Sequence, residues 1–377
     1  MSARQAALVN GVAGHALDFD DMGLGGIHPS VAVVPAVLAL AERIGAGGRR
    51  TCEALLAGYD AMGWISHAAG WSAYRRGFHA TGTVGAFGAA VACARLIGLD
   101  REGYVRALGL AAMQAAGLKI SFGSMAKHLN AGKAAANGLL AADLAARGFT
   151  APDDAIEGHQ GFVRTHGDPQ DFDLERARTT LGEENAVTQV LFKFHASCGG
   201  THAAIESVRA ALGDDLPALD DVAGVDVAVA EDLLDMCAIP EPRTGLEGKF
   251  SLRHATALVL AGRGTGPAGF TDEAVSDPVN VRARGLVRIT PSTRLSVGGA
   301  AEVVVTFADG RRRTASVDPY VPIPAAEVAG RHDAFAAKFT ELATPTIGAR
   351  RAREAIDVVA AIESLDDIGE LTALARP

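Results

Sequence analysis

The sequence predicts a mainly helical protein: an all-helical domain built from both chain ends, with a smaller α+β lid domain inserted between its two parts. Residues 1–150 read as successive apolar helices, and strand-like runs first occur beyond residue 186. Helical periodicity returns after about residue 325. Helices, a mixed segment and helices again are typical of an inserted domain. We therefore place the helical domain at 1–185 and 325–377 and the lid at 186–324.

The first part of the chain predicts four long helices. Ser30–Ile44 is almost wholly apolar and contains Pro35, so it forms one kinked helix or two short ones. Thr51–Ala69 begins with a threonine that suits an N-cap. Gly82–Gly98 carries glycines three apart and then alanines, which indicates close helix packing rather than a dinucleotide-binding loop. Ala131–Arg147 is rich in alanine and leucine.

The remaining segments predict the strands of the lid and the helices around them. The strand-like runs are Val187–Phe194, Val222–Val229, Leu286–Thr290 and a hairpin over Ala301–Val317. The expected helices are Thr201–Leu212 and Phe250–Ala261 in the lid, then Ala334–Leu342 and Ala352–Leu365 at the C-terminus.

Composition excludes several classes of protein. Among 377 residues, 49% are hydrophobic and 21% charged, which is an ordinary globular balance. A net charge of −9 disfavours nucleic-acid binding, and the apolar stretches are too short for a membrane span. The four cysteines lie far apart, which argues against a disulfide framework. We expect a cytoplasmic protein.

A cluster of acids and histidines near the N-terminus is the first candidate site. His15, Asp18, Asp20 and Asp21 precede a loop with three glycines that ends at His28. A histidine beside a carboxylate suits proton transfer. Helix capping by the aspartates is an alternative, and a divalent-metal site is another, although no metal-binding spacing supports it.

Four further clusters carry basic residues. Arg76 and His79 precede the glycine-rich helix, where they could bind an anion or form a solvated turn. The others lie at 123–133, 192–202 and 248–254. The chain has only six lysines against 29 arginines, and these last three clusters hold four of them, Lys127, Lys133, Lys193 and Lys249. Basic clusters in an acidic protein predict a small anionic ligand.

A hydrolytic nucleophile has little support. The sequence contains no G-x-S-x-G motif. Cys198, between two histidines, is the one thiol candidate, but the following Gly199-Gly200 fits a turn as well as an oxyanion hole.

Several motifs in order resemble the MmgE/PrpD family, which includes 2-methylcitrate dehydratase, cis-aconitate decarboxylase and iminodisuccinate epimerase. They are N-G-V-A-G-H-A-L-D-F-D-D with H-P-S, G-F-H-A-T-G-T-V-G-A-F-G-A-A, A-K-H-L-N-A-G-K-A-A and K-F-S-L-R-H. The resemblance runs from about residue 7 to the C-terminus. It implies cofactor-free chemistry on di- or tricarboxylates, in a cleft between a helical domain and a lid, within a homodimer.

The resemblance also implies site residues. The catalytic residues are expected to be Asp18, His28, His79, Lys127 and Lys193. The substrate-binding residues are expected to be Arg76, Cys198, His202, Arg253 and His254, with no metal ligand; some relatives have a tyrosine at the position of His254. The family usually has helices before the first motif, and we expect this sequence to lack them because it begins almost at that motif.

These observations predict an enzyme that removes or delivers a proton α to a carboxylate. It would be a 2-methylcitrate dehydratase-like lyase or an iminodisuccinate epimerase-like isomerase, and the wording K-F-S-L-R-H is closer to the epimerase branch. Two alternatives remain. One is a catalytically idle dicarboxylate-binding or scaffold protein, and the other is a metal-dependent hydrolase that uses the Asp18–Asp21 cluster.

Overall fold

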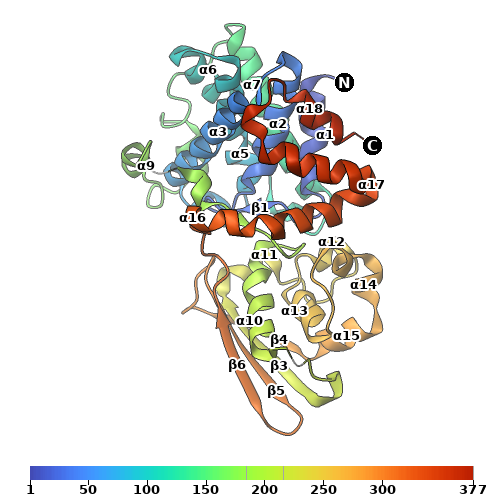
Figure 1. Ribbon diagram of the computed structural model, residues 1–377. Coiled ribbons are helices and arrows are strands. Elements are labelled where there is room, and N and C mark those ends of the chain that lie inside the picture. Colours follow the sequence, from blue (N-terminus) through green and yellow to red (C-terminus); the bar gives the residue numbers. More distant parts are fainter. Residues whose placement is uncertain (184, 215, 377) are drawn as a thin grey trace.

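The chain folds into a helical body and a smaller α+β lid, as the sequence predicts (Figure 1). The computed structural model describes residues 1–183, 185–214 and 216–376. The long helices of the body are α1 (Ala3–His15), α2 (Pro29–Ile44), α3 (Gly48–Ala69), α5 (Ala80–Ile97), α6 (Arg101–Ala112), α7 (Ala126–Ala146) and α17 (His332–Ala360). Its short helices are α4 (Ser72–Arg75), α8 (Phe162–His166), α9 (Leu174–Thr180), α16 (Ala325–Val328) and α18 (Gly369–Leu374).

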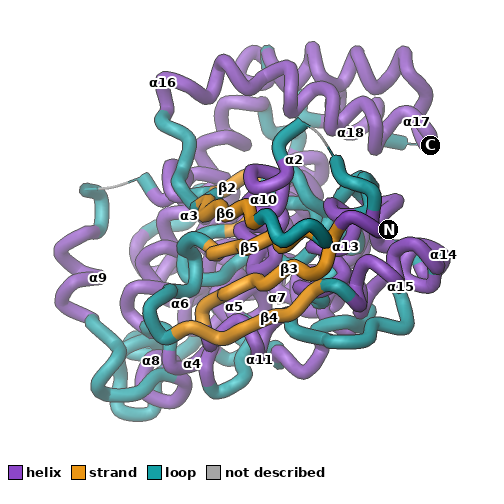
Figure 2. Tube along the Cα trace, turned by 90° about the horizontal axis from the view of Figure 1, so that it is seen from below, coloured by secondary structure: helices purple, strands orange, loops and turns teal. Residues whose placement is uncertain are grey.

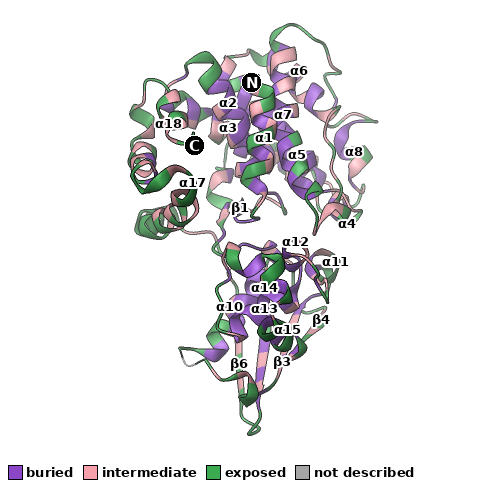
Figure 3. Ribbon diagram, turned by 90° about the vertical axis from the view of Figure 1, so that its right-hand side faces the viewer, coloured by how far each residue is buried: buried purple, intermediate pink, exposed green. Residues whose placement is uncertain are grey.

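Helix α5 lies at the centre of the body, between α2, α3, α6 and α7. Glycines permit this close packing: a Cβ at Gly138 would lie 2.3 Å from Ala89, and one at Gly88 would lie 2.4 Å from Met62. The predicted role of the glycine-rich segment in packing is therefore confirmed. By length and composition, α5 alone among the described helices could cross a membrane, but 83% of it is buried inside the protein. Figure 3 shows this buried centre.

The lid is built on a four-stranded sheet of order β4-β3-β5-β6 (Figure 2). Strands β3 and β4 are parallel, whereas β5 pairs antiparallel with both β3 and β6. Helices α10 and α13 pack against it. The strands are β3 (Val222–Ala230), β4 (Val287–Ser292), β5 (Ala301–Phe307) and β6 (Arg312–Val317). The helices are α10 (His202–Leu212), α11 (Leu234–Cys237), α12 (Gly245–Gly248), α13 (Leu252–Leu260), α14 (Asp272–Ser276) and α15 (Pro278–Gly285).

The predicted strand Val187–Phe194 is wrong over most of its length. Residues Ala186–Gln189 form a 3₁₀ turn, and only β2 (Leu191–Phe192) is extended. Its partner, β1 (Asp21–Met22), supplies just two residues for antiparallel pairing. This small sheet joins the start of the lid to the acidic turn that follows α1.

Two helix predictions are wrong in detail, and for the segment around Pro35 the structure has one helix, which is one of the two predicted alternatives. Helix α3 begins at Gly48, so Thr51 lies inside it and its hydroxyl donates to the Gly47 carbonyl instead of capping. Helix α2 continues through Pro35. The two predicted C-terminal helices are one element, α17, interrupted at Gly348, whose φ of 80° requires the left-handed conformation that glycine adopts readily. The first half of α17 runs along the junction between body and lid (Figure 1).

Candidate active site between the body and the lid

The turn after α1 places a buried carboxylate at the junction. Asp18 has a φ of 49°, a left-handed conformation that aspartate tolerates better than most residues. Its Oδ2 accepts a hydrogen bond from Lys127 Nζ at 2.8 Å, and its Oδ1 accepts one from Lys193 Nζ at 2.6 Å. Burial opposes ionisation of Asp18, but the charges of the two lysines outweigh it and hold its pKa well below the usual range. The structure thus joins three of the predicted residues in one buried ionic cluster.

His28 presents a proton-free nitrogen to this cluster. Its Nδ1–H donates to the Asp21 carbonyl at 2.6 Å, which leaves Nε2 as an acceptor 3.3 Å from Lys127 Nζ. Burial, and then the charge of Lys127, lower the pKa of His28 below its ordinary 6.5. The imidazole is therefore neutral at pH 7 and its Nε2 can take a proton.

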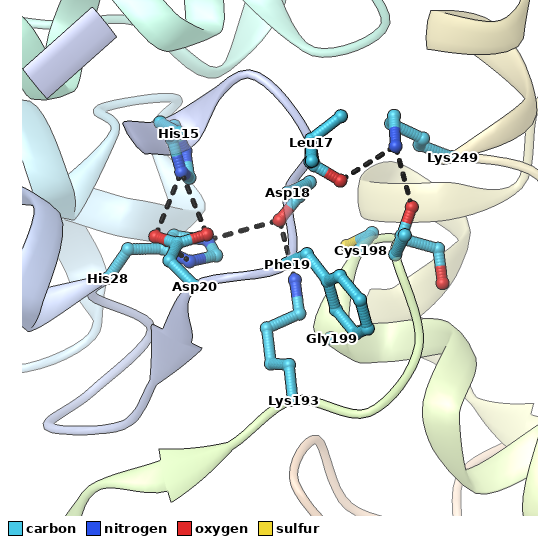
Figure 4. A network of polar contacts seen from close by, with 12 residues as sticks. His15, Leu17, Asp18, Phe19, Asp20, His28, Lys193, Cys198, Gly199 and Lys249 are labelled. Atoms are coloured by element: carbon cyan, nitrogen blue, oxygen red, sulfur yellow. Dashed lines mark hydrogen bonds and ion pairs between the residues drawn. The ribbon is translucent and has the colours of Figure 1, made fainter. Parts of the chain in front are cut away.

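A second carboxylate, Asp20, connects His28 to His15 (Figure 4). His15 Nδ1 lies 3.1 and 3.0 Å from the two Asp20 oxygens, and His28 Nδ1 lies 3.3 Å from Asp20 Oδ2. Burial lowers the pKa of His15 to about 4, so its ring stays neutral. His15 and Asp20 belong to the first candidate cluster of the sequence, but neither was among the expected catalytic or substrate-binding residues.

His79 lies at the start of α5, beside the same cluster. Asn130 Nδ2 donates to His79 Nδ1 at 3.1 Å, and the imidazole packs edge-on against Phe122 with ring centres 5.2 Å apart. Burial, and then Lys127, hold the pKa of His79 well below 6.5. His79 is thus a third neutral imidazole of this cluster, after His28 and His15.

A cleft of about 830 Å³ opens between the body and the lid, next to these groups. The body contributes Met22, His28, Trp71, Tyr74, His79 and Lys127 to its lining, and the lid contributes Cys198, Gly199, Met236, Phe250 and Tyr320. Hydrogen bonding from Cys237 lowers the pKa of the Cys198 thiol despite its burial. The volume suits a small molecule.

Four predicted substrate-binding residues are not in the described lining of this cleft. Arg76 is half-exposed and donates to the carbonyls of His166 and Gly167. Arg253 binds Glu241 at the lid surface. His202 is buried, with its ring edge-on to that of His195.

His254 is the fourth of these residues. It is fully buried in the lid, where its Nε2–H donates to the Gly269 carbonyl at 2.9 Å. Ser251 caps α13 just before Arg253 and His254, and the first turn of this helix directs the two side chains to opposite sides, one to the surface and one into the lid core. The residues of the K-F-S-L-R-H motif therefore belong mainly to the lid structure. Phe250 is the residue of this motif that lines the cleft.

Metal binding by the acidic cluster is possible by distance but disfavoured by charge. His15, Asp18, Asp20 and His28 each offer one ligand atom, and these atoms lie within 4.8 Å of one another. However, both Asp18 oxygens already accept hydrogen bonds from ammonium groups. A divalent cation there would face two lysine charges at close range, so these residues fit a metal poorly.

The fold and this cleft define a two-domain protein with an acid–base cluster buried between a helical body and an α+β lid. The chain belongs to the MmgE/PrpD family: the MmgE/PrpD N-terminal domain matches residues 1–175, and the MmgE/PrpD C-terminal domain matches residues 195–364.

Among its relatives are several decarboxylases. This chain is 26% identical to the cis-aconitate decarboxylase-like protein oryM of Aspergillus oryzae. The match covers 98% of this chain and 81% of that protein. The cis-aconitate decarboxylase of Aspergillus terreus is also 26% identical over 98% of this chain, with 80% of its own length covered. The human cis-aconitate decarboxylase is 34% identical over 162 residues, which are 42% of this chain and 34% of that protein.

Proposed function

We propose that this protein is a lyase that acts on a small di- or tricarboxylic acid and removes or delivers a proton next to a carboxylate. The observation that carries the proposal is the pairing of a proton-free His28 Nε2 with the Lys127 ammonium, 3.3 Å apart, in the lining of a cleft of about 830 Å³. A base and an ammonium at this spacing can share the two tasks of the reaction, proton transfer and neutralisation of the carboxylate.

The charge of the buried cluster favours an anionic substrate. Lys127, Lys193, Lys249 and Lys338 all place their ammonium groups on or beside the turn that carries Asp18. Asp18 and Asp20, whose pKa values are held low, supply only two full negative charges against them. Burial, and then the charge of Asp20, raise the pKa of Asp21 to about 7, so this third acid is only partly ionised at neutral pH. The remaining positive charge suits a carboxylate ligand.

Loss of CO₂ or water is the reaction we favour over epimerisation, because the relatives described above are named as cis-aconitate decarboxylases or decarboxylase-like. In this reading the cationic cluster stabilises the enolate-like state, and His28 is the group that exchanges the proton. His79, neutral and in the same cleft, is available as a second proton donor or acceptor.

A substrate panel tests the proposal. The purified protein is incubated in D₂O with cis-aconitate, citrate, 2-methylcitrate and iminodisuccinate, and NMR follows CO₂ loss, water loss, epimerisation and deuterium incorporation. We expect turnover of at least one tricarboxylate and no effect of a chelator. Calorimetric binding without turnover or exchange would favour the idle dicarboxylate-binding alternative. Activity lost on chelation and restored by a metal would favour the metal-dependent alternative.

A further inference from the structure

Four of the six lysines in this chain converge on one short turn, Leu17–Phe19. Two of them bind the Asp18 carboxylate, as described above. The other two bind the backbone on either side of Asp18. Lys249 Nζ donates to the Leu17 carbonyl at 2.7 Å, and Lys338 Nζ donates to the Phe19 carbonyl at 2.6 Å. Figure 4 shows the Lys249 contact beside the Asp18 contact.

We propose that Lys249 and Lys338 are positioning residues that fix the backbone of the Leu17–Phe19 turn and so hold the Asp18 carboxylate against Lys127 and Lys193. Their role in catalysis rests on the proposed function, whereas their role in holding the turn does not. Neither lysine was among the expected catalytic or substrate-binding residues. Lys249 belongs to one of the basic clusters of the sequence, and Lys338 belongs to none.

Each of these two ammonium groups ties the turn to a different part of the fold. Lys249, between α12 and α13 of the lid, also donates to the Ala196 carbonyl at 2.8 Å. Lys338, on α17, also donates to the Lys193 carbonyl at 2.7 Å and lies 4.0 Å from the centre of the Phe19 ring. The turn is therefore held from the lid, from the segment that leads into the lid and from the C-terminal helix.

The conformation of Asp18 explains why such support is needed. Its φ of 49° lies in a region that L-residues populate sparsely, and residues in such conformations persist where the surroundings determine them. The carbonyls of Leu17 and Phe19 flank Asp18, so fixing both restricts the peptide units on each side of it. A methionine in place of either lysine keeps the length of the side chain but has no N–H to donate.

Direct contact with the substrate is not how these lysines would act. Neither belongs to the described lining of the cleft, and the hydrogen bonds of both ammonium groups go to backbone carbonyls. Burial lowers the pKa of each lysine to about 8, which leaves both charged at neutral pH. A change at either position should therefore alter the orientation of Asp18 more than the affinity for substrate.

The test compares Lys338→Met and Lys249→Met with Lys133→Met, the same substitution at an exposed lysine on α7. Deuterium uptake by mass spectrometry is measured on the free proteins, and kcat and KM are measured on the substrate found in the panel. We expect both variants to take up deuterium faster over residues 15–22 while Lys133→Met does not. We expect kcat to fall about 10- to 100-fold, with KM little changed. Lys338 is only partly buried, so Lys338→Met still tests the proposal if Lys249→Met fails to fold.

The two measurements separate the possible failures. Unchanged deuterium uptake over residues 15–22 in Lys338→Met would overturn the proposal, whatever the activity. Faster uptake with unchanged kcat would show that the turn is held but that catalysis does not need it, and would also overturn the positioning role. An inactive wild-type protein would contradict the proposed function, and the uptake measurement would still decide whether these lysines hold the turn.

Discussion

Lys193 Nζ and Asp18 Oδ1 lie 2.6 Å apart, although 175 positions separate the two residues in the chain. Lys193 follows β2 at the start of the lid, and Asp18 precedes β1 in the body. Both side chains are at most 1% exposed. The ionic centre of the site therefore requires the lid segment and the body to be in place together, and each charge depends on the other for compensation.

Replacing Lys193 with methionine should destabilise the protein and weaken carboxylate binding. The change removes one of the two ammonium partners of Asp18 and leaves Lys127, so the cost should stay below the roughly 3–5 kcal/mol of a fully broken buried ion pair. Because Lys193 is fully buried, we expect the loss of citrate affinity to be almost independent of salt. Urea unfolding and calorimetry at low and high salt measure both effects.

The exposed Lys133→Met variant is the control for charge alone. In the double variant Asp18→Asn/Lys193→Met, stability should fall further rather than recover, because Lys127 then stays buried without its carboxylate partner. A Lys193→Met variant as stable as the wild type would show that the pair contributes little.

Replacing His28 with alanine should remove activity and leave the fold intact. General acid–base groups contribute about 10²–10⁴-fold to rate, so kcat should fall by that order if His28 moves the proton. The fold should survive because the interaction of His28 with Thr81 is made by its backbone N–H, which alanine retains. Steady-state kinetics and circular dichroism measure the two effects. The same change at exposed His159 is the control. A His28→Ala enzyme with wild-type kcat would remove His28 from the mechanism.

The sequence predicts those parts of the site and of the fold that depend on residues close together in the chain. Asp18 and His28 lie in one short stretch, and their turn and loop residues indicated a site before any fold was known. The glycine pattern of α5 likewise predicts its packing, since a Cβ would collide with neighbouring helices. Such features depend on neighbouring residues in the chain, so they can be read from it.

Contacts between residues far apart in the chain depend on the tertiary fold and could not be predicted from local motifs. Lys338 reaches the Phe19 carbonyl only because α17 crosses the junction, and no motif surrounds it. The sequence placed Arg253 and His254 in a basic cluster, but their orientation depends on how α13 packs into the lid. Adjacent positions on a helix point in different directions, so a cluster in sequence need not be a cluster in space.

Protonation of Asp21 should make the folded protein more stable at mildly acidic pH than at neutral pH. Burial, and then Asp20, raise the pKa of Asp21 to about 7 in the folded state, from 3.8 in the unfolded chain. Its contribution is therefore fully present below pH 3.8 and is lost as the pH rises through 7, on the order of 4 kcal/mol in total. His15 has the opposite pH dependence, because burial lowers its pKa from 6.5 to about 4. Its contribution to stability is therefore fully present above pH 6.5 and is lost as the pH falls through 4.

The variant Asp21→Asn isolates the Asp21 contribution. Without it, the free energy of unfolding should fall more steeply between pH 7 and pH 4, because His15 and the other low-pKa groups are no longer opposed. Urea unfolding of both proteins across this range provides the measurement. Parallel curves would mean that Asp21 is ionised in the folded protein throughout.

Ligand binding should protect both walls of the cleft at once. The lining combines Met22 and His28 from the body with Cys198 and Phe250 from the lid, so a bound acid contacts both. We expect the segment 186–324 to move as a unit over the body, and closure to exclude water from a reactive carbanion.

Citrate at saturation should then slow hydrogen exchange over residues 18–30 and over residues 192–202 together, measured by mass spectrometry against the ligand-free protein. The hairpin of β5 and β6, whose tip lies far from the junction of body and lid in Figure 1, provides the internal control. Protection confined to one of the two segments would show that the ligand does not bridge the domains, and a substrate site formed by both of them would then be wrong.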